Sequence, residues 1–140
     1  MTTTITRLTK HHGLGNDFLV CDASQLGASR PWEALAKAWC DRRTGIGADG
    51  LLVMTIDGDD RDHLTMVLFN ADGSRAEMSG NGIACLAQAA LLTGLAGGPS
   101  ITVATDAGLR LVRLAPGPDV RSLRATVDMG VVDVVDAPIG

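Results

Sequence analysis

The stretch of sequence that decides the fold is 70-NADGSRAEMSGNGIACLAQAALLTG-94. Its second half predicts a helix over residues 83–93, because apolar residues recur there at intervals of three and four. The expected buried stripe consists of Ile83, Leu86, Ala87, Ala90 and Leu91. Gly94 is suited to end the helix, since glycine readily adopts the left-handed conformation that follows many helices. The first half is rich in glycine, asparagine and aspartate, so a polar loop is expected to lead directly into a buried helix.

A second helix is predicted within residues 29–43. Pro31 suits a first-turn position, and Glu33 complements the positive end of the helix. Most of the remaining chain is predicted to form strands, because short apolar or alternating runs are bounded by turn residues. The predicted strands cover 18–22, 51–56, 64–69 and 123–129, with a hairpin over 101–114 that turns at 106–108, an acidic loop at 57–62 and a turn at 114–119.

These elements predict an α+β domain, in which a curved, mostly antiparallel sheet or open barrel surrounds a central helix. The connections do not resemble repeated βαβ units. Residues 1–140 are expected to form a single domain, and residues 131–140 resemble the beginning of a linker.

Composition excludes several classes of function. The net charge of −4 argues against a general nucleic-acid binder, and the aromatic content of 3% provides no platform for stacking bases. No apolar run is long enough to cross a membrane and no secretory signal is apparent, so a cytoplasmic location is expected. Cys21, Cys40 and Cys85 are interpreted as buried thiols of a reducing compartment. The histidines are not spaced as ligands with these cysteines, so no metal site is expected.

Three polar, glycine-rich loops are the candidates for chemistry: residues 11–18, 44–50 and 69–82. Each loop alone is most simply a turn between strands. Three such loops in one domain, each beside an apolar element, favour a functional site. His11 and His12 are interpreted as loop residues and receive no role. The patterns of a P-loop and of a dinucleotide-binding turn are both missing.

The loop at 69–82 is the most informative, because Gly80, Asn81 and Gly82 directly precede the predicted helix. The first N–H groups of a helix lack intrahelical partners and favour an anion, which here could be a carboxylate or a phosphate. Ser79 stands where a cysteine would gain a lowered pKa from the helix. Serine gains far less, and no histidine is adjacent in the sequence. The residues alone therefore favour a role for Ser79 as helix N-cap or ligand donor over a role as base.

The segments HGLGNDF, TGIGADGLL and FNADGSRAEMSGNG closely resemble three signatures of the diaminopimelate epimerase family, in the same order and spacing. The resemblance extends to VDMG at 127–130 and covers the first half of that enzyme. It implies two similar α+β halves with the substrate between them. It also implies epimerisation of LL- to meso-diaminopimelate without any cofactor, by one cysteine from each half. Pyridoxal phosphate would require a Schiff-base lysine, and the only lysines are Lys10 and Lys37, the latter on the expected wet side of a helix.

Carried onto this chain, the resemblance implies that Asn16 and Asn70 hydrogen-bond the substrate. Gly80 and Asn81 would provide backbone donors to its carboxylate. Ser79 occupies the position of the first catalytic cysteine.

Two departures from the family pattern affect the expected activity. The first catalytic position holds serine, and the half that would supply the second cysteine is absent. Little or no epimerase activity is therefore expected of the isolated chain, and a second half-domain or a homodimer is expected as partner. Two alternatives stay open: a related cofactor-free racemase or dehydratase, and a non-catalytic or engineered half that self-associates.

Overall fold

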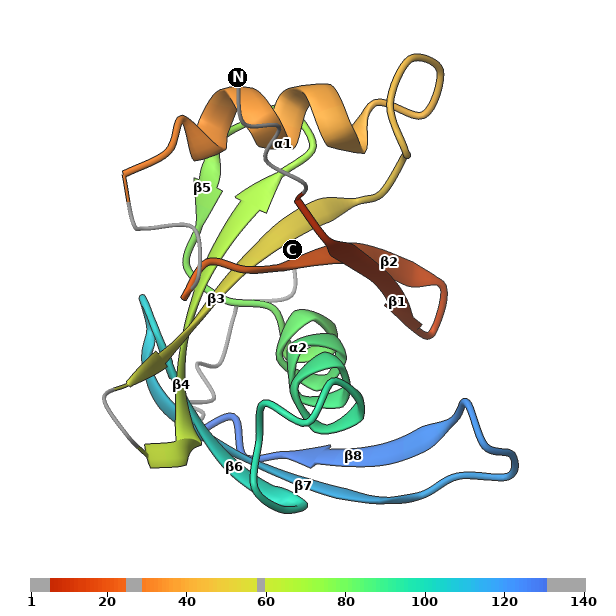
Figure 1. Cartoon of the computed structure of the whole chain (residues 1–140), viewed down its shortest axis with the longest axis vertical. Helices are drawn as coiled ribbons and strands as arrows, with labels where there is room; N and C mark the ends of the chain where they lie inside the picture. The colour runs from red at the N-terminus through yellow and green to blue at the C-terminus, as the bar shows by residue number, and fades with distance from the viewer. Residues whose placement is uncertain (1–5, 25–28, 58–59, 131–140) are drawn as a thin grey trace, which may run out of the picture.

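The computed structural model describes residues 6–24, 29–57 and 60–130, which form one eight-stranded sheet and two helices. The strands are β1 (Leu8–Gly13), β2 (Asn16–Asp22), β3 (Gly50–Asp57), β4 (Asp60–Asn70), β5 (Arg75–Ala76), β6 (Ser100–Thr105), β7 (Gly108–Pro116) and β8 (Leu123–Val127). The helices are α1 (Trp32–Cys40) and α2 (Gly80–Leu92). The sheet order is β1-β2-β3-β4-β6-β7-β8, with β5 paired to β4, and the sheet curls around α2 (Figure 1). The predicted α+β architecture is confirmed.

The sheet has a hydrophobic core on each face. Successive side chains of a strand point to opposite faces, so Phe18 and Val20 pack toward α2 while Leu19 and Cys21 pack toward α1. β3 is divided in the same way, with Leu52 in the core around α2. Coverage on both faces explains why β2 and β3 have continuous apolar runs rather than alternating ones.

Helix α2 begins three residues earlier than predicted, at Gly80, with Ser79 as its N-cap. More of its surface is buried than the predicted stripe, because Cys85 and Ala89 also belong to the core cluster that α2 shares with the sheet. The helix ends at Leu92, one residue earlier than predicted, and Gly94 follows the C-cap Thr93 with a φ of +76°, which suits its predicted role as the stop. Its predicted role as the central helix is confirmed.

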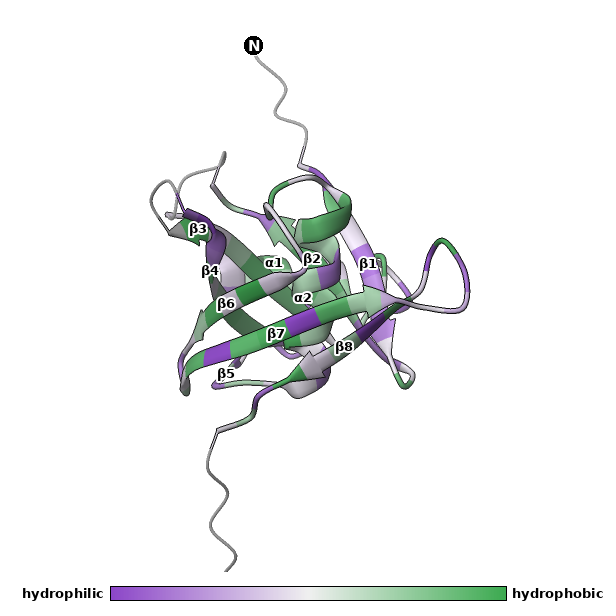
Figure 2. Cartoon of the chain, turned by 90° about the horizontal axis from the view of Figure 1, so that it is seen from below, coloured by the Kyte–Doolittle hydropathy of each residue, from purple (hydrophilic) through white to green (hydrophobic). Residues whose placement is uncertain are grey.

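The β6–β7 hairpin confirms its prediction, with Thr105 paired to Gly108. Figure 2 shows hydrophilic bands interrupting the hydrophobic length of β7, as expected of a strand with one buried face. The strand predicted over 123–129 is present as β8, but Ala125 on its inward side is exposed. This exposure arises because the curled sheet leaves a gap beside β8, where Ala125 lines a hollow.

Three other predictions need correction. The sheet is mostly antiparallel, but the β2–β3 and β4–β6 pairs are parallel, with α1 and α2 in the respective connections. Two strand–helix–strand crossovers are therefore present, which the sequence had not indicated. The described residues of the predicted acidic loop at 57–62 are strand, because Asp57 ends β3 and Asp60 starts β4, while residues 58–59 lie outside the described ranges. The turn predicted at 114–119 starts only after Pro116.

Two predictions concern the membrane and the tail. Neither helix in the described ranges combines the length and the apolar run needed to cross a bilayer. The predicted linker at 131–140 lies outside the described residues.

Candidate active site

The start of α2 presents free backbone donors. Ser79 is extended, with φ −141° and ψ 127°, and its Oγ accepts a hydrogen bond of 3.0 Å from the Gly82 N–H. Its carbonyl oxygen accepts the first helical bond, from the Ile83 N–H at 2.8 Å. The N–H groups of Gly80 and Asn81 donate no hydrogen bond to any described residue. Two amides at the positive end of a buried helix thus remain available to an anion.

The β1–β2 turn lies against this helix start. Leu14 and Gly15 form a two-residue turn with φ values of +55° and +84°, a geometry that suits the twist of a hairpin. A Cβ atom placed on Gly13 would lie 3.3 Å from the Asn81 Oδ1 atom. The close approach therefore favours glycine at position 13, and it brings the turn that precedes Asn16 to the α2 N-terminus.

His11 and His12 are not loop residues as predicted, because both belong to β1. The predicted loop at 11–18 is consequently reduced to its two-residue turn. Register explains the difference, since His11 pairs with Phe18 and His12 with Asp17 along an antiparallel ladder.

Asn70 lies at the same edge of the sheet. Phe18 pairs with Gly50, and Gly50 pairs with Asn70, so the start of β2 and the end of β4 are adjacent across β3. The Asn70 side chain donates to the Ser74 Oγ at 3.1 Å. A Cβ on Gly82 would lie 3.4 Å from the Leu52 Cδ2, so the first turn of α2 packs against β3 two residues beyond Gly50. The fold thus brings Asn16, Asn70 and the helix start to one edge of the sheet.

No base is hydrogen-bonded to Ser79 among the described residues. The only hydrogen bond that its Oγ forms with them comes from a backbone amide. His11 is engaged with Gln88 and Thr9, and His63 lies 3.7 Å from Asp60. The hydroxyl is therefore expected to be neutral, because serine needs an adjacent base to become a nucleophile.

Cys85 does not replace Ser79 as a reactive group. Its side chain is buried within α2, and burial, followed by the charge of Asp17, raises the pKa of the thiol to about 11. Cys21 and Cys40 are also buried, and burial raises the pKa of both. The prediction that all three thiols belong to the core is confirmed.

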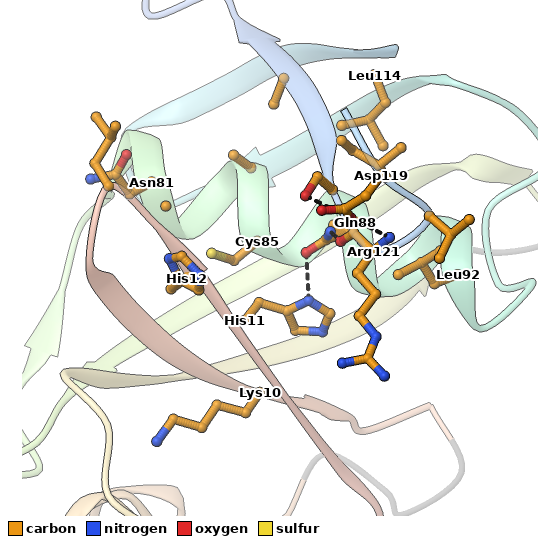
Figure 3. A pocket seen from close by; sticks show the side chains of 17 residues that line it. Lys10, His11, His12, Asn81, Cys85, Gln88, Leu92, Leu114, Asp119 and Arg121 are labelled. Carbon is orange, nitrogen blue, oxygen red and sulfur yellow. Dashed lines mark hydrogen bonds between the residues drawn. The ribbon is translucent and has the colours of Figure 1, made fainter. Parts of the chain in front are cut away.

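A hollow of about 840 Å³ extends along α2 between β1 and the turn that joins β7 to β8 (Figure 3). Asn81 lies at one end, and Leu92 lies at the other. The His11 Nδ1 lies 2.7 Å from the Gln88 Oε1, and the Gln88 Nε2 donates to the Arg121 carbonyl at 2.9 Å. Of the predicted site residues, only Asn81 lines this hollow. Ser79, Gly80, Asn16 and Asn70 lie outside it.

Met129 is a neighbour of the helix start that sequence reasoning missed. Its sulfur would lie 3.4 Å from a Cβ on Gly80, and 41% of the residue is exposed. An apolar side chain thus stands beside the free amides. The only sequence signal was its place in the VDMG segment, because nothing in the spacing links residue 129 to residue 80.

The arrangement is able to hold a small carboxylate, with two amides for the anion and asparagine side chains nearby for its other polar groups. In the described ranges, no group of three or more histidine, cysteine or acidic side chains is placed to hold a metal ion.

Comparisons with known proteins give a consistent picture. Residues 8–135 match the family model for diaminopimelate epimerase. The chain is 44% identical over 122 residues to a diaminopimelate epimerase of Moorella thermoacetica, an alignment that covers 86% of this chain and 42% of the relative. It is 40% identical over 131 residues to a diaminopimelate epimerase of Bacteroides thetaiotaomicron, covering 93% and 47%. The chain therefore spans less than half the length of these relatives.

Solved structures share the fold at lower identity. A predicted epimerase from Pseudomonas aeruginosa superposes with a TM-score of 0.59 at 22% identity, covering 83% of this chain and 38% of that one. A probable proline racemase from Agrobacterium radiobacter gives a TM-score of 0.61 at 16% identity, covering 81% and 38%. At these identities the likeness shows the fold alone.

Proposed function

This chain belongs to the diaminopimelate epimerase family, and from that premise we propose that residues 1–140 form its N-terminal half-domain and supply half of a cofactor-independent site. The proposed substrate is diaminopimelate, and the proposed reaction of the completed site is its LL-to-meso epimerisation by two bases. The observation that carries this proposal is the uncovered start of α2, where the Gly80 and Asn81 amides have no described partner beside Ser79.

The two free amides bind the α-carboxylate in this proposal. An α-proton of an amino acid is weakly acidic, so its removal requires stabilisation of the charge that spreads onto the carboxylate. Fixed amide donors and the positive helix end supply that stabilisation without reorganising during the reaction. Two charge-assisted hydrogen bonds from half a site are expected to give affinity on the order of 1 mM, about −4 kcal/mol.

The asparagines bind the remaining polar groups of the substrate. Asn16 is half-buried at the start of β2, and its side chain has no hydrogen-bonded partner among the described residues. Asn70 is exposed at the end of β4. A side-chain amide both donates and accepts, which suits a substrate that carries ammonium and carboxylate groups.

Ser79 stands at the position of the first base, and we propose that it leaves the isolated chain nearly inactive. A cysteine at a helix N-terminus is ionised more easily, whereas a serine hydroxyl without a base stays neutral. General-base catalysis contributes roughly 10²- to 10⁴-fold to rate. Ser79→Cys is therefore expected to raise α-proton exchange with deuterated water, if the substrate is bound as proposed.

The partner in this proposal is a second half-domain or a second copy of the chain. Leu14 is 98% exposed at the tip of the β1–β2 turn, and Met129 is 41% exposed beside Gly80. Both apolar side chains flank the proposed carboxylate site, where a partner would bury them. Sedimentation of the purified chain distinguishes the possibilities: a dimer supports a second copy, and a monomer supports a separate second half.

The proposed function is tested by titrating the ¹⁵N-labelled chain with meso-diaminopimelate. The largest shifts are expected at the amides of Gly80 and Asn81, followed by the side-chain amides of Asn16 and Asn70. Cadaverine is the matched control, because it keeps the two amino groups and lacks both carboxylates. Shifts that appear equally with cadaverine, or that avoid Gly80 and Asn81, would contradict the proposal.

A further inference from the structure

A junction of hydrogen bonds at Asp49 joins the two segments that carry the asparagines. The Asp49 N–H donates to the carbonyl oxygen of Asp17 at 2.9 Å and to its Oδ1 at 3.0 Å. The Asp49 Oδ2 accepts in return from the Asp17 N–H at 3.1 Å. On the other side, the Asp49 carbonyl accepts from the Ala71 N–H at 3.2 Å. Asp17 follows Asn16 and Ala71 follows Asn70, so one residue connects the neighbours of both.

Arg42 holds this junction together electrostatically. Its guanidinium donates to both carboxylate oxygens of Asp17, at 2.7 and 3.1 Å, and also to the Asp49 Oδ1 at 3.0 Å. Lys10 adds a weaker contact, with its Nζ 3.4 Å from the Asp17 Oδ2. Two carboxylates this close would repel one another without a cation between them. The Arg42 hydrogen bonds hold the pKa of Asp17 well below its usual range, so the Asp17 carboxylate stays ionised at neutral pH.

The cluster is placed to set local geometry rather than global stability. The side chains of Arg42 and Asp49 are 56% and 47% exposed, and exposed ion pairs typically contribute little to folding. The bonds instead join the segment between α1 and β3 to the start of β2 and to the turn that follows β4. The Asn16 side chain has no hydrogen-bonded partner among the described residues, so its position is set by its backbone, which pairs with Gly13 and continues into Asp17.

The chain contains a matched comparison for Arg42. Arg75 also forms a two-pronged pair with one carboxylate, that of Asp106, at 2.7 and 2.8 Å. Its side chain is 54% exposed, close to the value for Arg42. Asp106 belongs to the β6–β7 turn. The Arg75 backbone pairs with Phe69 beside Asn70, but its side chain donates only to Asp106 among the described residues and makes no hydrogen bond to the Asp49 cluster.

We propose that Arg42 and Asp49 are positioning residues of the candidate site, which fix the spacing of Asn16 and Asn70 through the backbone of Asp17 and Ala71. This inference rests on the proposed function for its consequence in substrate binding. Its structural part, the restraint on the start of β2 and on the turn after β4, can be measured without any ligand.

The experiment compares Arg42→Gln with Arg75→Gln in the 140-residue chain by hydrogen exchange of individual amides. Arg42→Gln is expected to accelerate exchange at Asp17, Asp49 and Ala71 by about tenfold, because about 1.4 kcal/mol of local restraint corresponds to that factor. Arg75→Gln is expected to leave these three amides unchanged. Arg42→Lys keeps the charge but loses the two-pronged pairing, so its exchange rates at the three amides are expected to lie between those of wild type and Arg42→Gln. It replaces Arg42→Gln in the comparison if the glutamine variant unfolds.

The same variants are then titrated with meso-diaminopimelate. Arg42→Gln is expected to weaken binding about tenfold, while Arg75→Gln binds as wild type and the melting temperatures of both variants stay similar. Unchanged exchange in both Arg42 variants, or equal binding by Arg42→Gln and wild type, would overturn the positioning role. If wild type itself fails to bind, the proposed function fails, and the exchange rates alone decide whether Arg42 restrains the loops.

Discussion

Ser79 allows two properties of the α2 N-terminus to be separated, because it is both the helix cap and a neighbour of the proposed carboxylate site. Ser79→Ala removes the side-chain acceptor of the Gly82 N–H but leaves the Gly80 and Asn81 amides in place. Ser79→Asp preserves a side-chain acceptor at the cap, since aspartate caps helices as well as serine does. It also places a negative charge beside the ligand. The two variants are therefore expected to have opposite effects on stability and on binding.

The magnitudes follow from the geometry. Loss of a side-chain cap costs about 1 kcal/mol, and for a chain of 140 residues this lowers the melting temperature by about 3–4 °C. Ser79→Asp is expected to melt within about 2 °C of wild type, since its charge also complements the helix dipole. Two carboxylates about 4 Å apart repel by about 1 to 4 kcal/mol, so Ser79→Asp should weaken binding of meso-diaminopimelate by at least about fivefold. Ser79→Ala should bind within about threefold of wild type.

Thermal unfolding by circular dichroism and the amide titration provide the two measurements. Ser24→Ala is the control for loss of a surface hydroxyl, because the Ser24 hydroxyl donates to Asp22 two residues away and to no other described residue. The reasoning is refuted if Ser79→Asp binds as tightly as wild type, because the anion then lies elsewhere. It is equally refuted if Ser79→Ala has the same melting temperature as Ser24→Ala, because the Ser79 hydroxyl then does not cap α2.

Three further outcomes are expected. Gly45→Ala should prevent folding or lower the melting temperature severely, because its Cβ would overlap the Ala38 carbonyl oxygen; Gly98→Ala, with open space around its Cβ, is the control. Ile83→Ala should cost about 2–5 kcal/mol in urea unfolding, since Ile83 is fully buried and its loss leaves a cavity; a cost below about 1 kcal/mol would contradict the packing. Burial raises the pKa of Cys85 to about 11 from an ordinary value of 9.0. The stability that the neutral Cys85 thiol contributes is therefore present below pH 9 and is lost as the pH rises to 11. Cys85→Ser should remove that part of the pH dependence of unfolding measured over this range.

Local sequence signals were sufficient for the core elements. The apolar recurrence after residue 82 and Gly94 located α2, and the alternation on either side of Asp106 located the β6–β7 hairpin. The β1–β2 turn was harder, because HHGLGNDF reads as a continuous polar loop. Only pairing in three dimensions shows that both histidines continue a strand up to Gly13.

The site was predictable as a set of loops but not as a set of contacts. The glycines before Ile83 indicated free amides at a helix start, which the structure contains. The Arg42–Asp17–Asp49 cluster was missed, since charges in separate loops carry no mutual signal in one sequence. The gap in the sheet was missed for a similar reason: alternation placed Ala125 on an inner face, but the degree of closure of the sheet decides whether that face is covered.

The two parallel strand pairs have a consequence for how quickly the chain reaches its native state. The parallel pairing of β2 with β3 requires the connection that contains α1 to return the chain to the same end of the sheet. The pairing of β4 with β6 requires the same of the connection that contains α2. Each closure loses chain entropy before its contacts form, and topologies of this kind fold over milliseconds to seconds rather than microseconds. The β1–β2 and β6–β7 hairpins pair strands that are close in the sequence and can form early. We expect the closure of the sheet around α2 to be the last step. Stopped-flow refolding should therefore reveal a slow final phase that Ile83→Ala, at the centre of that closure, alters more than any change in either hairpin turn.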